Sequence, residues 1–369
     1  MNNRLTAHQA CMLLYISIIA SKFQRLSALL SQPFSRNIWL VAFFYLVIDL
    51  GLTALTIFIA SKFNGQTLFD FISSRFGRVA MLFVALAFSV YFYFKIGASY
   101  KGVHEFFANT LFDKLSWSYF SIILLLLLVF LTTNGLNIIG RSCELYGLLI
   151  SVCILVAMGL GLKSCNFDQL LPVLDIDFST VLSRGVKFVP WFANYMIIFL
   201  FAGNLEMDKK CKKNLFLTYL ISGLLVVAVY VLFVAINGSL SVFQNNTLSS
   251  ITQNSLIGLG IGRPDWFLVL ITMIGNFLST ALYFFGIVYC FCKAFGIKYC
   301  YLSVIMGAIL LYLSDIMLLP NLDASENILF NYSSYYMLAI NILLPIICLV
   351  ALAVKERHTK SGYRARCEI

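Results

Sequence analysis

Ionisable side chains within apolar stretches are the residues of this sequence best placed to do chemistry. The stretch Ile16 to Leu30, ISIIASKFQRLSALL, carries Lys22 and Arg25 in the middle of a long apolar run. A charge at that depth in a membrane costs about 2.5–3.5 kcal/mol on insertion scales. The two residues are three apart, so a continuous helix would place them on one face. We therefore expect either a segment that does not span a membrane or charges that have partners and a function.

Further ionisable groups lie in later apolar runs. Asp49 is expected to face the interior of a helix bundle, as a partner for one of the bases. Lys95, in YFYFKIGAS, must face protein or water, which makes it a candidate for a proton-linked or anion-linked site. Lys101 and Glu105 are four apart and can pair, and the simpler interpretation is a structural pair near the membrane surface. His104 lacks a catalytic partner on its own helical face, so no enzyme is predicted.

The composition shows what kind of element must position these groups. Of the 369 residues, 61% are hydrophobic and 11% are charged, and the mean hydropathy is +0.90. Soluble domains carry about 25% charged residues. The apolar residues form unbroken runs, which favours membrane helices over a barrel. The net charge of +10 indicates a topology bias rather than nucleic-acid binding. Ten scattered cysteines and three histidines predict neither a metal site nor a cofactor.

The predicted fold class is an all-α polytopic membrane protein with about ten transmembrane helices. Each predicted span is close to the ~20 residues that cross a bilayer. The spans are His8–Leu30, Asn37–Ala60, Val79–Asn109, Trp117–Leu136, Glu144–Leu162, Phe188–Leu205, Leu215–Ile236, Trp266–Phe291, Tyr301–Leu319 and Tyr335–Val354. With the N-terminus inside, sixteen Lys and Arg fall in inner segments against six in outer ones. This asymmetry predicts that both termini are cytoplasmic.

A long connection divides the spans into two groups of five. We expect one membrane domain over residues 1–369, with a first repeat at 5–162, an extracytoplasmic connection at 163–187, a second repeat at 188–354 and a basic cytoplasmic tail at 355–369. Five is an odd number, so the two groups have opposite orientation, as in an inverted repeat. The repeat rests on this count and orientation, because the two halves show no clear residue-by-residue similarity.

The start of the sixth predicted span, GVKFVPWFANYMIIFLF, contains a second irregularity. Pro190 removes a backbone donor and disfavours helical geometry at the preceding residue. The proline either begins the helix or marks a discontinuous one. Broken helices at the start of each half hold the substrate in inverted-repeat transporters. The candidate substrate-binding residues are therefore Ser21, Lys22, Arg25, Pro190, Asn194 and Tyr195, and the candidate coupling or structural ion-pair residues are Asp49, Lys95, Lys101 and Glu105.

Three short segments resemble a known family. The LLPVL segment at Leu170–Leu174, the loop Lys62–Phe83 and KGVHEFF at Lys101–Phe107 are similar to the permease-like B subunits of spore germinant receptors. This family lies within the amino acid–polyamine–organocation superfamily. The first span lacks the usual glycine at its break, and Ala193 and Asn194 stand where relatives carry Gly-Glu. These departures suggest either an altered ligand chemistry or a divergent member of the family that no longer binds the usual amino acid.

The resemblance implies a leucine-transporter-like fold and a role in recognising a small germinant, often an amino acid. It also implies partner subunits, namely an A-type subunit and a C-type lipoprotein, and a place in the inner spore membrane or plasma membrane of a spore-forming bacterium. An alternative function is a proton-coupled amino acid transporter. A positive charge at the break could serve either function, by pairing with a substrate carboxylate or by standing where a sodium ion would sit.

Overall fold

The computed structural model is built from helices and describes residues 5–24, 26–110, 117–172, 181–244, 246–256, 265–318 and 328–354. No strand occurs within these ranges. The main helices are α1 (Ala7–Lys22), α2 (Leu26–Phe34), α3 (Ile38–Ala60), α4 (Leu68–Phe76), α5 (Arg78–Thr110), α6 (Trp117–Thr132), α7 (Leu136–Gly161), α9 (Val189–Phe192), α10 (Ile197–Phe201), α11 (Lys209–Asn237), α12 (Thr247–Leu256), α13 (Asp265–Phe295), α14 (Tyr301–Leu318) and α16 (Ser333–Ala353).

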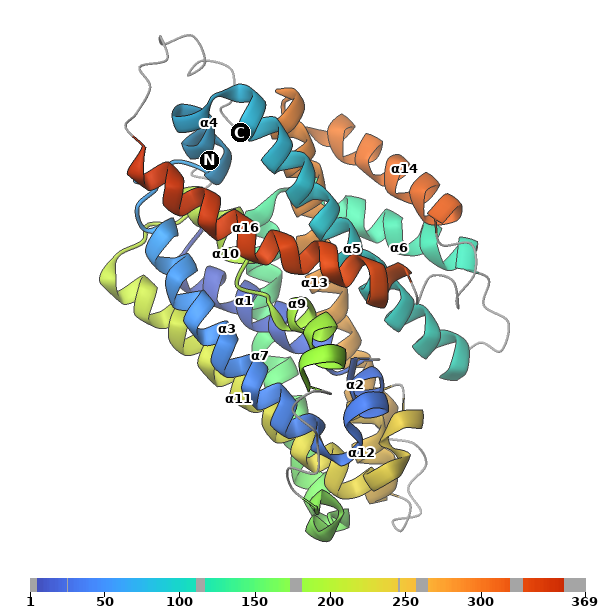
Figure 1. Ribbon diagram of the computed structural model, residues 1–369. Coiled ribbons are helices and arrows are strands. Elements are labelled where there is room, and N and C mark those ends of the chain that lie inside the picture. The colour runs from blue at the N-terminus through green and yellow to red at the C-terminus, as the bar shows by residue number, and fades with distance from the viewer. Residues whose placement is uncertain are drawn as a thin grey trace.

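The helix α1 runs through the middle of the bundle. It packs against α7, α11 and α13, while α5 lies along α13 and α3 lies along α11. Figure 1 shows α6 and α14 side by side at the edge of the molecule, and these two helices are in contact. Lys22 therefore lies on a helix that is surrounded by other helices, while Asp49 on α3 and Lys95 on α5 lie on helices that each pack against a neighbour.

The side chains on the outer helix faces are apolar and suited to contact with lipid. Phe130 on α6 is 72% exposed, and Leu126, Leu145 and Leu302 are also exposed on outer helix faces. Lys22, Asp49 and Lys95 are instead only 2–3% exposed. Apolar residues outside and charged residues inside are the arrangement expected of a chain that spans a bilayer. The protein is thus an integral, multi-pass membrane protein.

The number of crossings is not fixed by helix length alone. Seven helical segments in the described residues are long and apolar enough to span, and two shorter apolar helices cover Phe120–Thr132 and Tyr301–Ser314. The predicted first span falls on α1 and α2, and the predicted sixth span falls on α9 and α10. The count of ten spans and the inverted repeat remain predictions.

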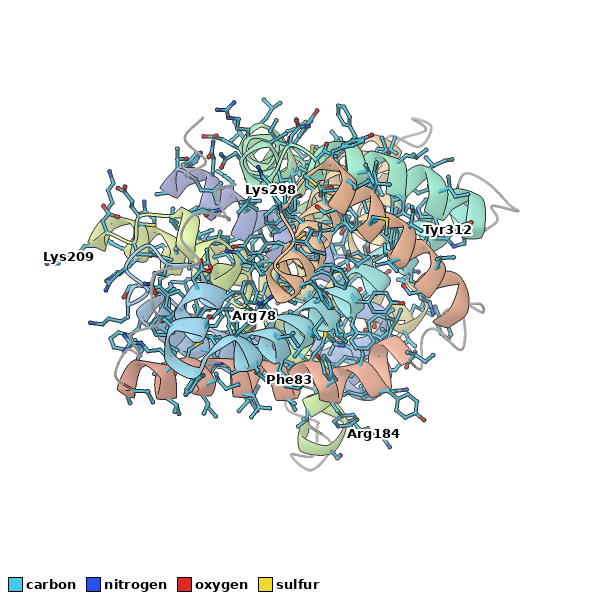
Figure 2. The ribbon with its side chains drawn as sticks, turned by 90° about the horizontal axis from the view of Figure 1, so that it is seen from above. Arg78, Phe83, Arg184, Lys209, Lys298 and Tyr312 are labelled. Atoms are coloured by element: carbon cyan, nitrogen blue, oxygen red, sulfur yellow. The ribbon has the colours of Figure 1, made fainter. Side chains whose placement is uncertain are left out.

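The first and last described segments lie at the same end of the bundle. The Leu5 N–H donates to Asn204 O at 2.9 Å, and Arg75 at the end of α4 donates to Val354 O at 2.6 Å. A Cβ added to Gly203 would lie 2.8 Å from Thr67 Cα, so α4 is packed closely against the end of the sixth predicted span. Figure 2 shows Lys209, at the start of α11, on the periphery of the molecule, and Arg184 at another edge. Which membrane face each end occupies stays a prediction.

Candidate functional site

The first predicted span is broken at the residues where its charges lie. Helix α1 ends at Lys22, and α2 begins at Leu26. The freed carbonyls need donors because the membrane interior supplies none. The Tyr230 hydroxyl on α11 donates to Lys22 O at 2.8 Å, and the Thr247 N–H at the start of α12 donates to Phe23 O at 2.9 Å. The break is therefore held by side chain and backbone donors from the second half of the chain.

The sixth predicted span is broken in the same manner. Pro190 lies in the first turn of α9, and the helix ends when Ala193 adopts φ −67° and ψ 75°. The proline thus begins a one-turn helix, and the discontinuity follows it. The resulting carbonyls all have donors: Lys95 Nζ binds Pro190 O at 2.9 Å and Trp191 O at 3.3 Å, the Tyr219 hydroxyl binds Phe192 O at 3.2 Å, and the Tyr91 hydroxyl binds Ala193 O at 3.0 Å.

Asn194 connects the two broken spans. Its Nδ2 donates to Ser17 O on α1, and its Oδ1 accepts a hydrogen bond from Lys95 Nζ at 3.3 Å. The side chain is buried. One amide group therefore contacts α1 and α5 from the break between α9 and α10.

A small cavity lies between the two breaks. Its volume is about 30 Å³, and its walls are Ser21, Gln24, Leu26, Lys95, Ala98, Ser99, Trp191, Tyr283 and Phe330. Since a cavity needs about 10–15 Å³ to hold one water, this space holds about two. Trp191 packs against Phe330 with ring centroids 4.8 Å apart and donates its Nε1 hydrogen to Ser334 at 2.8 Å. The cavity has an aromatic wall and several hydrogen-bonding groups, and its volume is very small.

A second cavity, of about 10 Å³, lies on another side of the first break. Lys22 and Asp49 both line it, together with Phe192 and Tyr219. Lys22 Nζ donates to Ile18 O at 3.2 Å and lies 5.3 Å from the centroid of the Phe192 ring. Asp49 Oδ2 accepts from the Tyr219 hydroxyl at 3.1 Å, while its Oδ1 is buried without a hydrogen-bond partner. A basic and an acidic side chain thus share one buried space, and Tyr219 connects that space to the break in the sixth span.

Comparisons with known proteins identify the family and the fold of this chain. The pattern of the spore germination protein family matches residues 4–322. The chain belongs to the spore germination protein family. Among curated proteins, no significant sequence match was found. One similar solved structure is a nucleobase-cation-symport-1 family transporter in a closed conformation with bromovinylhydantoin bound, at 16% identity and a TM-score of 0.59, covering 94% of this chain and 78% of that one.

A second similar structure is a Na⁺-coupled sialic acid symporter in a substrate-bound, outward-open state. It has 12% identity and a TM-score of 0.58, and the match covers 94% of this chain and 79% of that one. At these identities the likeness shows the fold alone, which is the leucine-transporter-like fold expected from the sequence. The spore germination protein is therefore a permease-like membrane protein.

Two of the predicted substrate residues line the two cavities, one in each. Ser21 lines the larger cavity, whereas Lys22 lines the smaller one. Pro190 and Asn194 lie at the break in the sixth span, where both contact Lys95. Tyr195 is buried beside them, and its hydroxyl has no hydrogen-bond partner.

The remaining predicted residues have different outcomes. Arg25 lies outside the described residues, so the expectation that it shares a face with Lys22 stays a prediction. Lys101 is buried on α5, but the side chain of Glu105 lies outside the described part, so their pairing stays a prediction. The tail at 355–369 also lies outside the described ranges.

Several site residues of the spore germination protein were missed in the sequence. Gln24 and Trp191 are adjacent to the predicted breaks and could have been included by proximity. Tyr91, Tyr219 and Tyr230 are donors from distant helices, and nothing in their local spacing distinguishes them from other tyrosines in apolar runs.

Proposed function

We propose that this protein is the permease-like subunit of a spore germinant receptor, and that it recognises a small germinant such as an amino acid and triggers germination. The observation that carries the proposal is the cavity between the two helix breaks. Ser21, Gln24 and Ser99 offer hydrogen bonds there, and Trp191 and Phe330 offer an aromatic surface. Binding sites at discontinuous helices are the usual arrangement in inverted-repeat transporters.

The size of the cavity limits the ligand and requires a change of shape. A space of about 30 Å³ cannot hold an amino acid, so binding must widen it. The shortest route is a separation of the Trp191–Phe330 pair from α1, because these rings form one wall. We propose that this widening, in contact with an A-type subunit and a C-type lipoprotein, is the signal for germination. The proposed location is the inner spore membrane, with both termini cytoplasmic.

Tryptophan emission of the purified protein tests this function. Trp191 is buried in the cavity wall, so a ligand that enters should change its emission in a saturable manner. We expect at least one of the twenty common amino acids to do so and to raise the melting temperature. Trp191→Phe should lose the emission change, whereas Trp39→Phe, on α3, should keep it. If none of the amino acids changes either the emission or the melting temperature, the proposed recognition is incorrect.

The alternative function is a proton-coupled amino acid transporter. The buried Lys22 and Asp49 favour it, because a carboxylate that has one free oxygen in a closed space is a suitable proton acceptor. Proteoliposomes containing this protein alone distinguish the two functions. Amino acid uptake that depends on an inward proton gradient and stops with a protonophore would support transport. Binding without uptake would support a pure sensor.

A further inference from the structure

The ammonium group of Lys95 has a complete set of partners inside the membrane. Its three N–H donors face three acceptors, which are Pro190 O at 2.9 Å, Trp191 O at 3.3 Å and Asn194 Oδ1 at 3.3 Å. The side chain is 3% exposed, and Nζ lies 5.6 Å from the Trp191 ring centroid and 5.8 Å from that of Tyr91. All of these contacts come from the break in the sixth span or from α5 itself.

The three acceptors form a set that would attract a cation even without Lys95. Two are successive main-chain carbonyls at the end of the one-turn helix α9, and the third is a side-chain amide oxygen. Unpaired carbonyls in a membrane interior cost several kcal/mol each. Carbonyls at the ends of discontinuous helices coordinate free cations in inverted-repeat transporters. The geometry is that of a small monovalent-cation site.

We propose that the break in the sixth span is a monovalent-cation site occupied by the Lys95 ammonium, a cation tethered to α5, so that no free metal ion binds there. Lys95 is a positioning residue in this proposal. It fixes α9 against α5 and so sets one wall of the cavity. The proposal does not depend on which germinant is recognised or on whether solute is transported.

Lys22, another buried lysine of the described residues, provides a contrast. Lys22 Nζ donates to a single carbonyl, Ile18 O, which lies within its own helix. No oxygen acceptor from the other broken span binds the Lys22 ammonium in the described residues. Lys22 is the appropriate matched control, because it is equally buried and also lies at a break.

The experiment removes the tethered cation and supplies a free one. Wild type, Lys95→Ala and Lys22→Ala are purified in detergent, and melting temperatures are measured in choline chloride with increasing sodium, ammonium or methylammonium chloride at constant ionic strength. Lys95→Ala should melt below wild type in choline and rise by about 3 °C or more with at least one small cation, following the mass-action stabilisation of a bound ligand. The melting temperatures of wild type and of Lys22→Ala should not depend on which cation is present.

Two further measurements keep the outcome decisive. Removing one acceptor with Lys95→Ala/Asn194→Ala should reduce the cation-dependent rise, which a general salt effect would leave unchanged. If Lys95→Ala cannot be purified, wild type alone still tests the proposal, because sodium-dependent melting at constant ionic strength would show a free cation site in its place. A folded Lys95→Ala that is insensitive to all three cations overturns the proposal.

Discussion

Substituting Gly286 by alanine should show that the spacing of α5 and α13 is fixed by a single close contact. A Cβ at this position would lie 2.7, 2.9 and 3.0 Å from three ring atoms of Phe92. Such separations are essentially never seen for a real Cβ, so a helix or the ring must shift. Lys95 lies three residues after Phe92 on α5, and a shift of α5 therefore reaches the cavity.

The size of the destabilisation caused by Gly286→Ala depends on how little the Phe92 ring can move. The ring is fully buried, and its centroid lies 4.6 Å from that of Phe88, 5.6 Å from Tyr91 and 6.2 Å from Tyr283. Overpacking of a well-filled core costs about 1–3 kcal/mol. By the scaling of unfolding entropy with chain length, this cost corresponds to a drop in melting temperature of about 1–4 °C.

The assay is thermal unfolding of purified Gly286→Ala, with Gly275→Ala on the same helix as the matched control. A Cβ at Gly275 meets the end of the flexible Ile150 side chain at 3.1 Å, so that variant should melt at or slightly above wild type. The double variant Gly286→Ala/Phe92→Leu should lose less stability than the sum of the losses in the two single variants. If Gly286→Ala melts no lower than Gly275→Ala, the contact with Phe92 does not set the helix spacing.

Two further predictions concern the smaller cavity and the topology. Lys22→Met should abolish ligand binding in the emission assay and destabilise the inserted protein, because the Asp49 carboxyl stays buried in the smaller cavity without a basic side chain there. Lys22→Met/Asp49→Asn should recover stability. Normal binding by Lys22→Met would make Lys22 structural. Hydrogen bonding with the backbone at Ser303 lowers the pKa of the exposed Cys300 thiol. In a Cys367→Ser background, a membrane-impermeant maleimide should label Cys300 at lower pH than an ordinary thiol and only after permeabilisation, and the labelling should be lost when Cys300→Ser is added. Labelling in intact cells would place this loop outside.

The sequence indicated where the helices break because the causes are local. A charge within an apolar run marked the first break at Lys22, and a proline within an apolar run marked the second at Pro190. The proline acts on the backbone directly, because it lacks a donor and restricts the preceding residue, whereas the lysine marks a position that must find polar partners. The two interpretations of Pro190 were offered as alternatives, but the proline begins α9 and the discontinuity follows one turn later.

The division of the site into two cavities could not be predicted in this way. Ser21 and Lys22 are adjacent and were assigned to one substrate site, yet neighbouring residues on a helix point in directions about 100° apart. Which direction faces which cavity depends on how α1 is rotated against α5, α11 and α13. That rotation is set by packing over the whole bundle. The sequence therefore predicted the depth of these side chains better than their direction.

Helices α5 and α11 belong to the site, although neither is broken, because they supply the hydrogen-bond donors for the free carbonyls at the two breaks. A discontinuous helix in a bilayer exposes carbonyls that must be paired, and water is not available to pair them. α5 supplies Lys95 and Tyr91, and α11 supplies Tyr219 and Tyr230. Tyr230 binds the first break and Tyr219 the second, so α11 holds both broken spans at once. Opening the cavity must therefore lengthen or exchange some of these hydrogen bonds, and a bound ligand would have to replace them.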